Sequence, residues 1–176
     1  MTDEYNSFNG KPKQKSSTSI LVDEFKRGAE ESGHKVEVLD VCHMNINPCI
    51  GCIQCGYEGP CVQKDDTVIV KDKLLSSDVL VFATPTYFST MNGMLKNLID
   101  RFLPKWQDLG KHDVYFIITG HDGKRGLELV EKELITVFEN LGNTVMGTIW
   151  GEGVWQKGEV MNTKAMLEAY KAGKNI

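Results

Sequence analysis

The chain has 176 residues and a mass of 19.7 kDa, which suits one domain, residues 1–176, with a buried core. The formal net charge is -4 and the lysines are scattered, so the composition gives no support for nucleic-acid binding. No apolar run is long enough to cross a bilayer and no charged-then-apolar leader opens the sequence. We therefore expect a cytoplasmic protein without a membrane partner.

The first half of the chain starts with a polar, lysine-rich segment, residues 1–19. Apolar side chains then recur at helical spacing over residues 18–32, and residues 36–41 have the composition of a strand. After a long stretch without periodicity, a short helix is predicted over residues 67–76 with Asp66 as its N-cap.

The second half contains three continuous apolar runs, residues 79–83, 114–119 and 144–150, which are typical of strands covered on both faces in a parallel sheet. Helices are predicted between and after these strands, over residues 91–103, 126–141 and 163–171, the last with Asn162 as its cap.

This alternation of strands and helices predicts an α/β fold with a parallel sheet and right-handed crossovers. Ligands of such sheets bind at the carboxyl ends of the strands. The informative loops should therefore follow Val41, Ala83, Thr119 and Trp150.

Four of the five cysteines lie close together after an Asn-Pro pair, with the spacing C-x2-C-x2-C-x5-C. Such a run favours a [4Fe-4S] cluster, because structural zinc sites usually contain two C-x2-C pairs a dozen or more residues apart. Zinc and a set of metal-free thiols remain as alternatives. We expect a cysteine-rich loop insertion at about residues 42–66, with Cys49, Cys52, Cys55 and Cys61 as the metal ligands.

Three further loops have the composition of a flavin site. Residues 9–19 carry lysines and hydroxyls before a helix, which suits a phosphate, although a solvated tail has the same composition. Residues 84–93 offer a flat aromatic surface with hydroxyls at its rim, or a turn that only covers the core. In residues 119–126 glycines would let the backbone approach a planar ligand, and we assign no catalytic role to His121 and Asp122.

The chain resembles the flavodoxin-like NAD(P)H-dependent FMN reductases, and within them the iron-sulfur flavoprotein branch. Residues 9–18, NGKPKQKSST, match the family's phosphate loop, residues 84–101, TPTYFSTMNGMLKNLIDR, match its second loop and the following helix, and the cysteine spacing matches that branch.

The resemblance implies a flavodoxin-like three-layer sandwich with a doubly wound, parallel five-stranded sheet, assembled as a homodimer or homotetramer. It also implies that FMN is bound by two groups of residues. The phosphate group is Lys11, Lys13, Ser16, Ser17 and Thr18, and the ring group is Pro85, Thr86, Tyr87, Phe88, Ser89, Thr119 and Gly120.

Two departures from the family pattern bear on this interpretation. Lys11 stands where the family has serine, so a hydroxyl is lost. Lys13 stands where the family has arginine, so a bidentate hydrogen-bond donor is replaced by a point charge. The polar segment MTDEYNSF occupies the place of an apolar first strand, so we expect a first strand that is either irregular or contributed differently, with consequences for the phosphate site.

The resulting hypothesis is an oxidoreductase that transfers electrons from transiently bound NAD(P)H through FMN, and through a [4Fe-4S] cluster if one is held, to an unknown acceptor. The chemistry is assigned to the flavin and to no catalytic side chain. The alternatives are an electron carrier without its own substrate, and a flavin-free zinc or thiol scaffold that binds a partner.

Overall fold

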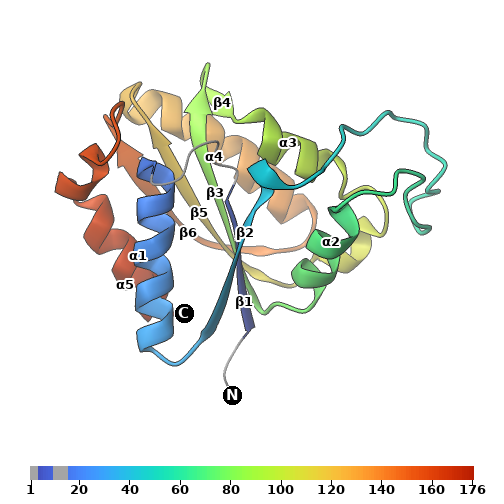
Figure 1. The fold of residues 1–176 in the computed structure, drawn as a ribbon, viewed down its shortest axis with the longest axis horizontal. Coiled ribbons are helices and arrows are strands. Elements are labelled where there is room, and N and C mark those ends of the chain that lie inside the picture. The colour runs from blue at the N-terminus through green and yellow to red at the C-terminus, as the bar shows by residue number, and fades with distance from the viewer. Residues whose placement is uncertain (1–3, 10–15) are drawn as a thin grey trace.

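The computed structural model describes the backbone of residues 4–9 and the whole of residues 16–176. Its centre is a sheet with the strand order β2-β1-β3-β5-β6, in which all four neighbouring pairs are parallel (Figure 1). This order confirms the predicted doubly wound sheet of the flavodoxin type. The strands are β1 (Glu4–Asn9), β2 (Lys35–Asp40), β3 (Val79–Tyr87), β5 (Asp113–Gly120) and β6 (Thr144–Glu152), and a short β4 (Thr90–Met91) pairs antiparallel with β3.

Helices cover both faces of this sheet. On one face lie α1 (Ser17–Glu31) and α5 (Ala165–Lys174), and on the other lie α2 (Thr67–Leu75), α3 (Gly93–Asp100) and α4 (Gly123–Asn140) (Figure 1). Short 3-10 helices span Val41–His43, Trp106–Leu109 and Glu159–Asn162. Among the described residues, no helix combines the length and the apolar character that a bilayer crossing requires.

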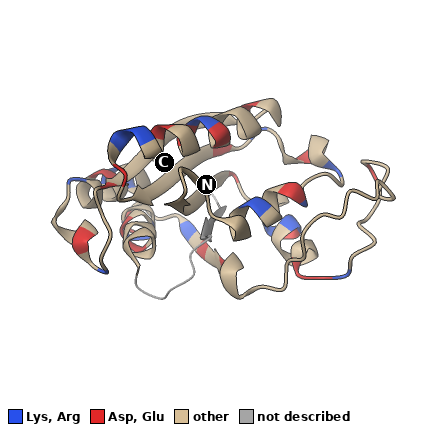
Figure 2. Ribbon diagram, turned by 90° about the horizontal axis from the view of Figure 1, so that it is seen from above, with Lys and Arg blue, Asp and Glu red and all other residues tan. Residues whose placement is uncertain are grey.

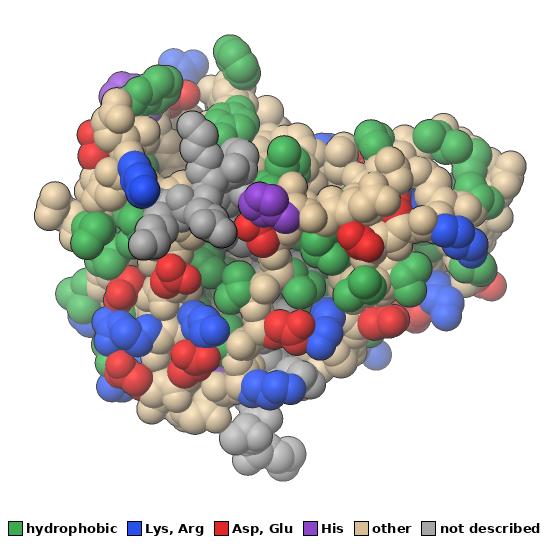
Figure 3. All heavy atoms as spheres, viewed as in Figure 1, with side chains coloured by type: hydrophobic (Ala, Val, Ile, Leu, Met, Phe, Trp, Pro, Cys, Tyr) green, Lys and Arg blue, Asp and Glu red, His purple; other side chains and the backbone are tan. Residues whose placement is uncertain are grey.

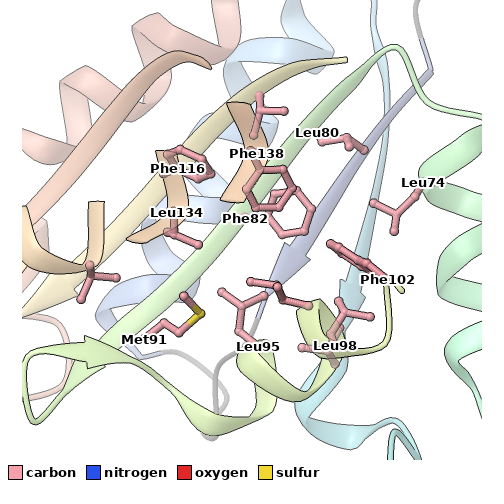
Figure 4. Packing of buried hydrophobic residues seen from close by; sticks show 14 of the residues in the cluster. Leu74, Leu80, Phe82, Met91, Leu95, Leu98, Phe102, Phe116, Leu134 and Phe138 are labelled. Carbon is pink, nitrogen blue, oxygen red and sulfur yellow. The ribbon is translucent and has the colours of Figure 1, made fainter. Parts of the chain in front are cut away.

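The larger hydrophobic core lies between the sheet and the α2, α3 and α4 face (Figure 4). Phe82 on β3 and Phe138 on α4 lie with ring centroids 4.3 Å apart, and Phe102 packs near both. Buried aromatic pairs of this kind stabilise beyond their area, so they fix the distance between β3 and its covering helices.

Basic and acidic residues are interspersed along the helices (Figure 2). The cysteine-containing segment between Val41–His43 and α2 extends away from the sheet in both views (Figures 1 and 2). Two parts of the chain are thereby kept apart: a regular sheet, and a protruding loop that carries four of the thiols.

The expectation that the first strand is irregular or contributed differently is wrong. The backbone of β1 pairs with β2 from Glu4↔Lys35 to Asn9↔Asp40 and with β3 from Tyr5↔Val79 to Asn9↔Ala83. Ladder hydrogen bonds are made by backbone groups, so two neighbouring strands hold this segment in register although its sequence is polar.

One predicted cap is confirmed in position only, and another is wrong. Asp66 is the N-cap residue of α2, as predicted, but its side chain makes no capping hydrogen bond; instead Asp65 Oδ1 accepts bonds from the backbone N–H and the hydroxyl of Thr67, at 3.1 and 2.5 Å. The last helix begins at Ala165, because Thr163 is extended and Asn162 ends a separate 3-10 turn. Caps depend on the backbone path, which the residue type alone does not determine.

A proline at the centre of β1 tests its inner position. Ser7→Pro removes a backbone N–H between two ladders and should destabilise the fold by about 1–3 kcal/mol, through an unpaired carbonyl and lost pairing. Ser7→Thr retains the N–H and is the matched control. Equal urea midpoints for the two variants would contradict a β1 strand flanked on both sides.

Candidate functional site

A cavity of about 880 Å³ lies at the carboxyl ends of β3 and β5, beside the N-terminus of α1. Its volume is within the usual range of ligand pockets, about 300–1,000 Å³. Among the described residues, four segments line it: Ser16, Ser17 and Thr18; Pro85, Thr86, Tyr87 and Phe88; Thr119, Gly120, His121 and Asp122; and Val154, Trp155, Gln156 and Lys157.

The first wall is the N-terminus of α1. Ser16 is the N-cap, and Thr18 Oγ1 lies 2.6 Å from Thr119 Oγ1 in a buried hydrogen bond that ties this helix to β5. The first amides of a helix have no intrahelical partner and attract anions, and the first turn of α1 contains no acidic residue to compete. The structure therefore brings Ser16, Ser17 and Thr18 together on the cavity wall, while Lys11 and Lys13 lie outside the described residues.

The second wall follows β3. Thr84 Oγ1 accepts a bond from Asn92 N–H at 3.1 Å, and Asn92 Oδ1 accepts one from Leu95 N–H, which caps α3. Between these anchors Phe88 and Ser89 have φ of 52° and 60°, a left-handed conformation that is uncommon outside glycine. The turn leaves the Phe88 side chain fully exposed at the cavity and places Ser89 outside the residues that line it.

Tyr87 is half-exposed on the same loop. Burial, and then electrostatic repulsion by Cys42, raise the pKa of its phenol, so the hydroxyl is protonated at neutral pH. Tyr87 can thus present both a ring face and a hydrogen-bond donor to a ligand.

The third wall depends on a glycine. A Cβ atom built on Gly120 would overlap the Thr86 hydroxyl and press on its Cβ and Cγ2. Without a side chain at this position, the ends of β3 and β5 can approach each other and expose backbone to the cavity.

The fourth wall is a loop with an exposed tryptophan. The Trp155 ring is 5.6 Å from the His121 ring in an edge-on contact and is 76% exposed. Its loop is fixed by Glu159, whose carboxylate accepts bonds from the Trp155 and Gln156 amides at 2.7 and 2.8 Å. These two bonds lower the pKa of Glu159.

Sequence reasoning directed attention to the loop after Trp150 but did not identify Trp155, Gln156 or Lys157. The sequence did contain a usable signal, because Gly153 and Gly158 flank the tryptophan in a run that has neither strand nor helix periodicity. In the structure both glycines have positive φ angles, 70° and 84°. Likewise, His121 and Asp122, which we left without a role, lie on the cavity wall.

A second, small cavity of about 20 Å³ is lined by Cys49, Cys52, Cys55 and Cys61, together with Arg101 and apolar neighbours. All four thiols are free; Cys55 is buried, Cys61 is half-buried, and Cys49 and Cys52 are exposed. The predicted cysteines thus face one space, which has room for about one water molecule. In the part of the chain that the structure describes, no three Cys, His, Asp or Glu side chains are arranged to hold a metal ion.

An ion pair closes the neck of the cysteine loop. Arg101 donates to Asp65 Oδ2 at 2.6 Å, to Asp65 Oδ1 at 3.2 Å and to the Asn47 carbonyl at 2.7 Å. The two side chains are 1% and 0% exposed. Asp65 also accepts from the Asn47 amide, so it joins the two ends of the loop. The sequence analysis included Arg101 only as the last residue of the matching motif, residues 84–101, and did not predict this role.

Sequence comparisons relate this chain to known proteins. A sequence model of the family described as NADPH-dependent FMN reductase matches residues 7–156. An iron-sulfur flavoprotein of Archaeoglobus fulgidus is 38% identical over 95 residues, 54% of this chain and 46% of that protein. One from Methanocaldococcus jannaschii is 34% identical over 95 residues, 54% and 49% of the two chains. The chain spans about half the length of these curated relatives.

A solved structure shares the fold over nearly the whole chain. The NAD(P)H:quinone oxidoreductase from Methanothermobacter marburgensis matches with a TM-score of 0.80 and 18% identity, covering 99% of this chain and 97% of that one. At this identity the likeness supports the architecture, and the site has to be argued from its own residues.

The buried neck predicts a pH-dependent contribution to stability. Burial alone would raise the pKa of Asp65, but the hydrogen bonds from Arg101, Thr67 and Asn47 outweigh it and hold the pKa well below its ordinary value. The stabilisation is therefore complete above the unfolded pKa of about 4 and is lost as the pH falls through the lower, folded pKa.

Asp65→Asn should lower the free energy of unfolding by about 3 kcal/mol at neutral pH, because Arg101 keeps its buried charge without a counter-ion. The difference from wild type should shrink in urea titrations as the pH falls below about 4. The control is Asp66→Asn, whose bond to the Asn45 amide is solvent-exposed. A difference between wild type and Asp65→Asn that stays constant with pH would contradict the ionised pair.

Proposed function

Because the chain belongs to the NADPH-dependent FMN reductase family, whose sequence model matches residues 7–156, we propose that it is an FMN-dependent oxidoreductase that passes electrons from NAD(P)H to an acceptor. One observation carries this proposal. Three segments that the sequence predicted for phosphate and ring binding, around residues 16–18, 85–88 and 119–120, enclose a single cavity of about 880 Å³.

The residues of the cavity fit FMN at both of its ends. The first amides of α1, with the hydroxyls of Ser16 and Ser17, suit the phosphate, and Lys11 and Lys13 are proposed as its cations. The hydroxyls of Thr86 and Tyr87 suit the polar edge of the ring system, and Gly120 leaves its backbone open to the ring face. When bound, FMN supplies hydride acceptance and electron transfer in single or paired steps.

The protein's part in this reaction is to bind and to position. The Thr18–Thr119 hydrogen bond keeps the anion site at a fixed place relative to the ring site, because it joins α1 directly to β5. No G-x-G-x-x-G follows a strand in this sequence. We therefore propose that a nicotinamide visits the open side of the cavity, under Trp155, without a dinucleotide-binding domain of its own.

We also propose that Cys49, Cys52, Cys55 and Cys61 hold a [4Fe-4S] cluster. Four thiols around one cavity are the donor set that such a cluster takes, and Arg101 Nη2 lies 3.4 Å from Cys61 Sγ as a hydrogen-bond donor. The cavity is smaller than a cluster, so the loop has to rearrange on loading. Zinc and metal-free thiols are the alternatives for the same residues.

A second candidate function is electron carriage without a dedicated substrate. The cysteine loop exposes large apolar side chains, Ile50, Ile53, Tyr57 and Val62, as the hydrophobic spheres on the protruding lobe indicate (Figure 3). Exposed apolar patches beside a redox centre suit transient docking of a protein partner.

The assembly proposed for this chain is a homodimer or homotetramer in the cytoplasm. Phe88 and Trp155 are 102% and 76% exposed at the rim of the flavin cavity. Aromatic side chains of this exposure are typical of surfaces that become buried in assemblies.

Stopped-flow spectroscopy of the FMN-loaded protein separates these functions. An oxidoreductase should lose its flavin absorbance rapidly on mixing with NADPH or NADH, whereas a carrier should be reduced only after a protein reductase is added. A preparation that stays colourless after incubation with FMN would refute both and favour the flavin-free scaffold. Iron, sulfide and zinc assays on the same sample distinguish the contents of the cysteine site.

A small substitution tests the ring site. Gly120→Ala places a methyl group against Thr86 and should weaken FMN binding about tenfold or more, which is about 1.4 kcal/mol. The measurement is a titration that follows quenching of flavin fluorescence. Gly147→Ala on β6 is the control, because a Cβ there meets no atom within 4 Å. Equal affinities for the two variants would place the flavin elsewhere.

A further inference from the structure

The loop that follows β6, residues 153–158, presents an exposed tryptophan at the larger cavity. Gly153 and Gly158 bound this loop with φ angles of 70° and 84°, a backbone conformation that other residues rarely adopt. Between them, Val154 packs in the hydrophobic core on the α1 and α5 face, whereas the Trp155 side chain is 76% exposed. Both residues line the cavity, so the loop turns its large ring outward at the site itself.

Three hydrogen bonds hold the backbone of this loop in place. The Val154 N–H donates to the Gly120 carbonyl at 3.1 Å, which fastens the loop to the end of β5. One carboxylate oxygen of Glu159, Oε2, accepts from the N–H groups of Trp155 and Gln156 at 2.7 and 2.8 Å. Hydrogen bonds to an ionised acceptor are about twice as strong as those between neutral groups. The backbone of Trp155 is therefore anchored although its ring is not buried.

The orientation of the tryptophan ring is restrained by a histidine. His121 directly follows β5, and its ring meets the Trp155 ring with centroids 5.6 Å apart and planes at 69°. Such an edge-on contact is a preferred arrangement of two aromatic rings, and the indole keeps most of its surface free for a ligand. A ring that is held in place before binding loses little conformational entropy when a ligand stacks on it.

Two observations favour a second substrate, rather than the flavin, as the ligand of this ring. The cavity volume of about 880 Å³ is near the upper end of the usual range, so a second ring system can enter beside a first. Thr119 and Gly120, which are proposed for the flavin ring, are buried, whereas Trp155 is exposed. Trp155 therefore lies where a ligand enters and leaves the cavity.

We propose that Trp155 binds the planar ring of the second substrate by stacking, and that Glu159 is a positioning residue that holds Trp155 at the cavity. The ring belongs to the nicotinamide donor or to a planar electron acceptor, which have this chemistry in common. The inference rests on the proposed FMN-dependent reaction and is independent of the cysteine site.

Trp155→Ala tests the stacking contact. In stopped-flow reduction of the FMN-loaded protein, the NADPH concentration for half-maximal rate should rise about tenfold, the effect of losing one aromatic stack, while the limiting rate changes less. Trp155→Phe should restore most of the loss because it keeps an aromatic face. Trp106→Ala is the control, since Trp106 is also exposed but does not line this cavity. The affinity for FMN should be equal in all four proteins.

Two further measurements separate the donor from the acceptor. Oxidised NADP⁺ binds without reacting, so calorimetry on the FMN-loaded protein should show about tenfold weaker binding to Trp155→Ala if the ring serves the donor. Reoxidation of the reduced protein is then followed with menadione, a planar acceptor, and with ferricyanide, which has no ring. If the ring serves the acceptor, Trp155→Ala should raise the half-saturating concentration of menadione and leave reoxidation by ferricyanide unchanged.

A double-mutant cycle tests the role of Glu159. Glu159→Ala should raise the same half-saturating concentration by up to about tenfold, and Glu159→Gln, which keeps an acceptor oxygen, should largely restore it. Adding Glu159→Ala to Trp155→Ala should have little further effect, because Glu159 acts through the ring. Additive effects would contradict the positioning role. If Trp155→Ala fails to fold, as a thermal melt would show, Glu159→Ala against Glu159→Gln decides alone.

Three results overturn the inference in distinguishable ways. If Trp155→Ala leaves NADPH, NADP⁺ and menadione binding unchanged, the stacking role is refuted and the flavin proposal stands; a changed sedimentation coefficient would then assign the ring to a subunit interface. If Trp155→Ala weakens FMN binding instead, the ring stacks on the flavin and the inference is refuted. If wild type binds no FMN, the inference falls together with the proposed function.

Discussion

Parallel pairing of the five central strands is the constraint on which both sites depend. Because β1, β2, β3, β5 and β6 all run the same way, their carboxyl ends and the loops that follow meet at one edge of the sheet. The strand order changes direction between β1 and β3, so the crevice opens there. The start of α1 and the loops after β3 and β5 reach this crevice without long excursions, and the buried Thr18–Thr119 bond closes the arrangement.

A single short helix connects this crevice to the cysteine site. Asn92 caps α3 directly after the loop of Tyr87, and Arg101 ends the helix at the neck of the cysteine loop. The ends of α3 are held by a buried cap and a buried ion pair. In the proposed function, this helix sets the relative placement of the flavin and the cysteines.

Much of the sheet was predictable because two of its inner strands, β3 and β5, contain continuous apolar runs. β3 and β5 are covered by helices on both faces. The apolar runs that begin at Val79 and Val114 could therefore be recognised as strands although apolar and polar residues do not alternate in them. Hydroxyls and aromatic rings directly after a buried strand drew attention to the loop after Ala83, and residues 85–88 of this loop line the larger cavity. The four cysteines face one cavity, as their spacing suggested.

Other features depend on contacts between residues distant in the sequence, and local patterns do not encode them. β1 is polar, and only its two neighbours explain its place. Asp65, rather than Asp66, bonds Thr67 because its carboxylate also meets Arg101 across 36 residues of chain. The most direct test of the account is a crystal structure of the protein grown with saturating FMN. We predict the ring between the Tyr87 loop and Gly120, with the phosphate at the start of α1; an empty crevice, or FMN bound elsewhere, would contradict the account.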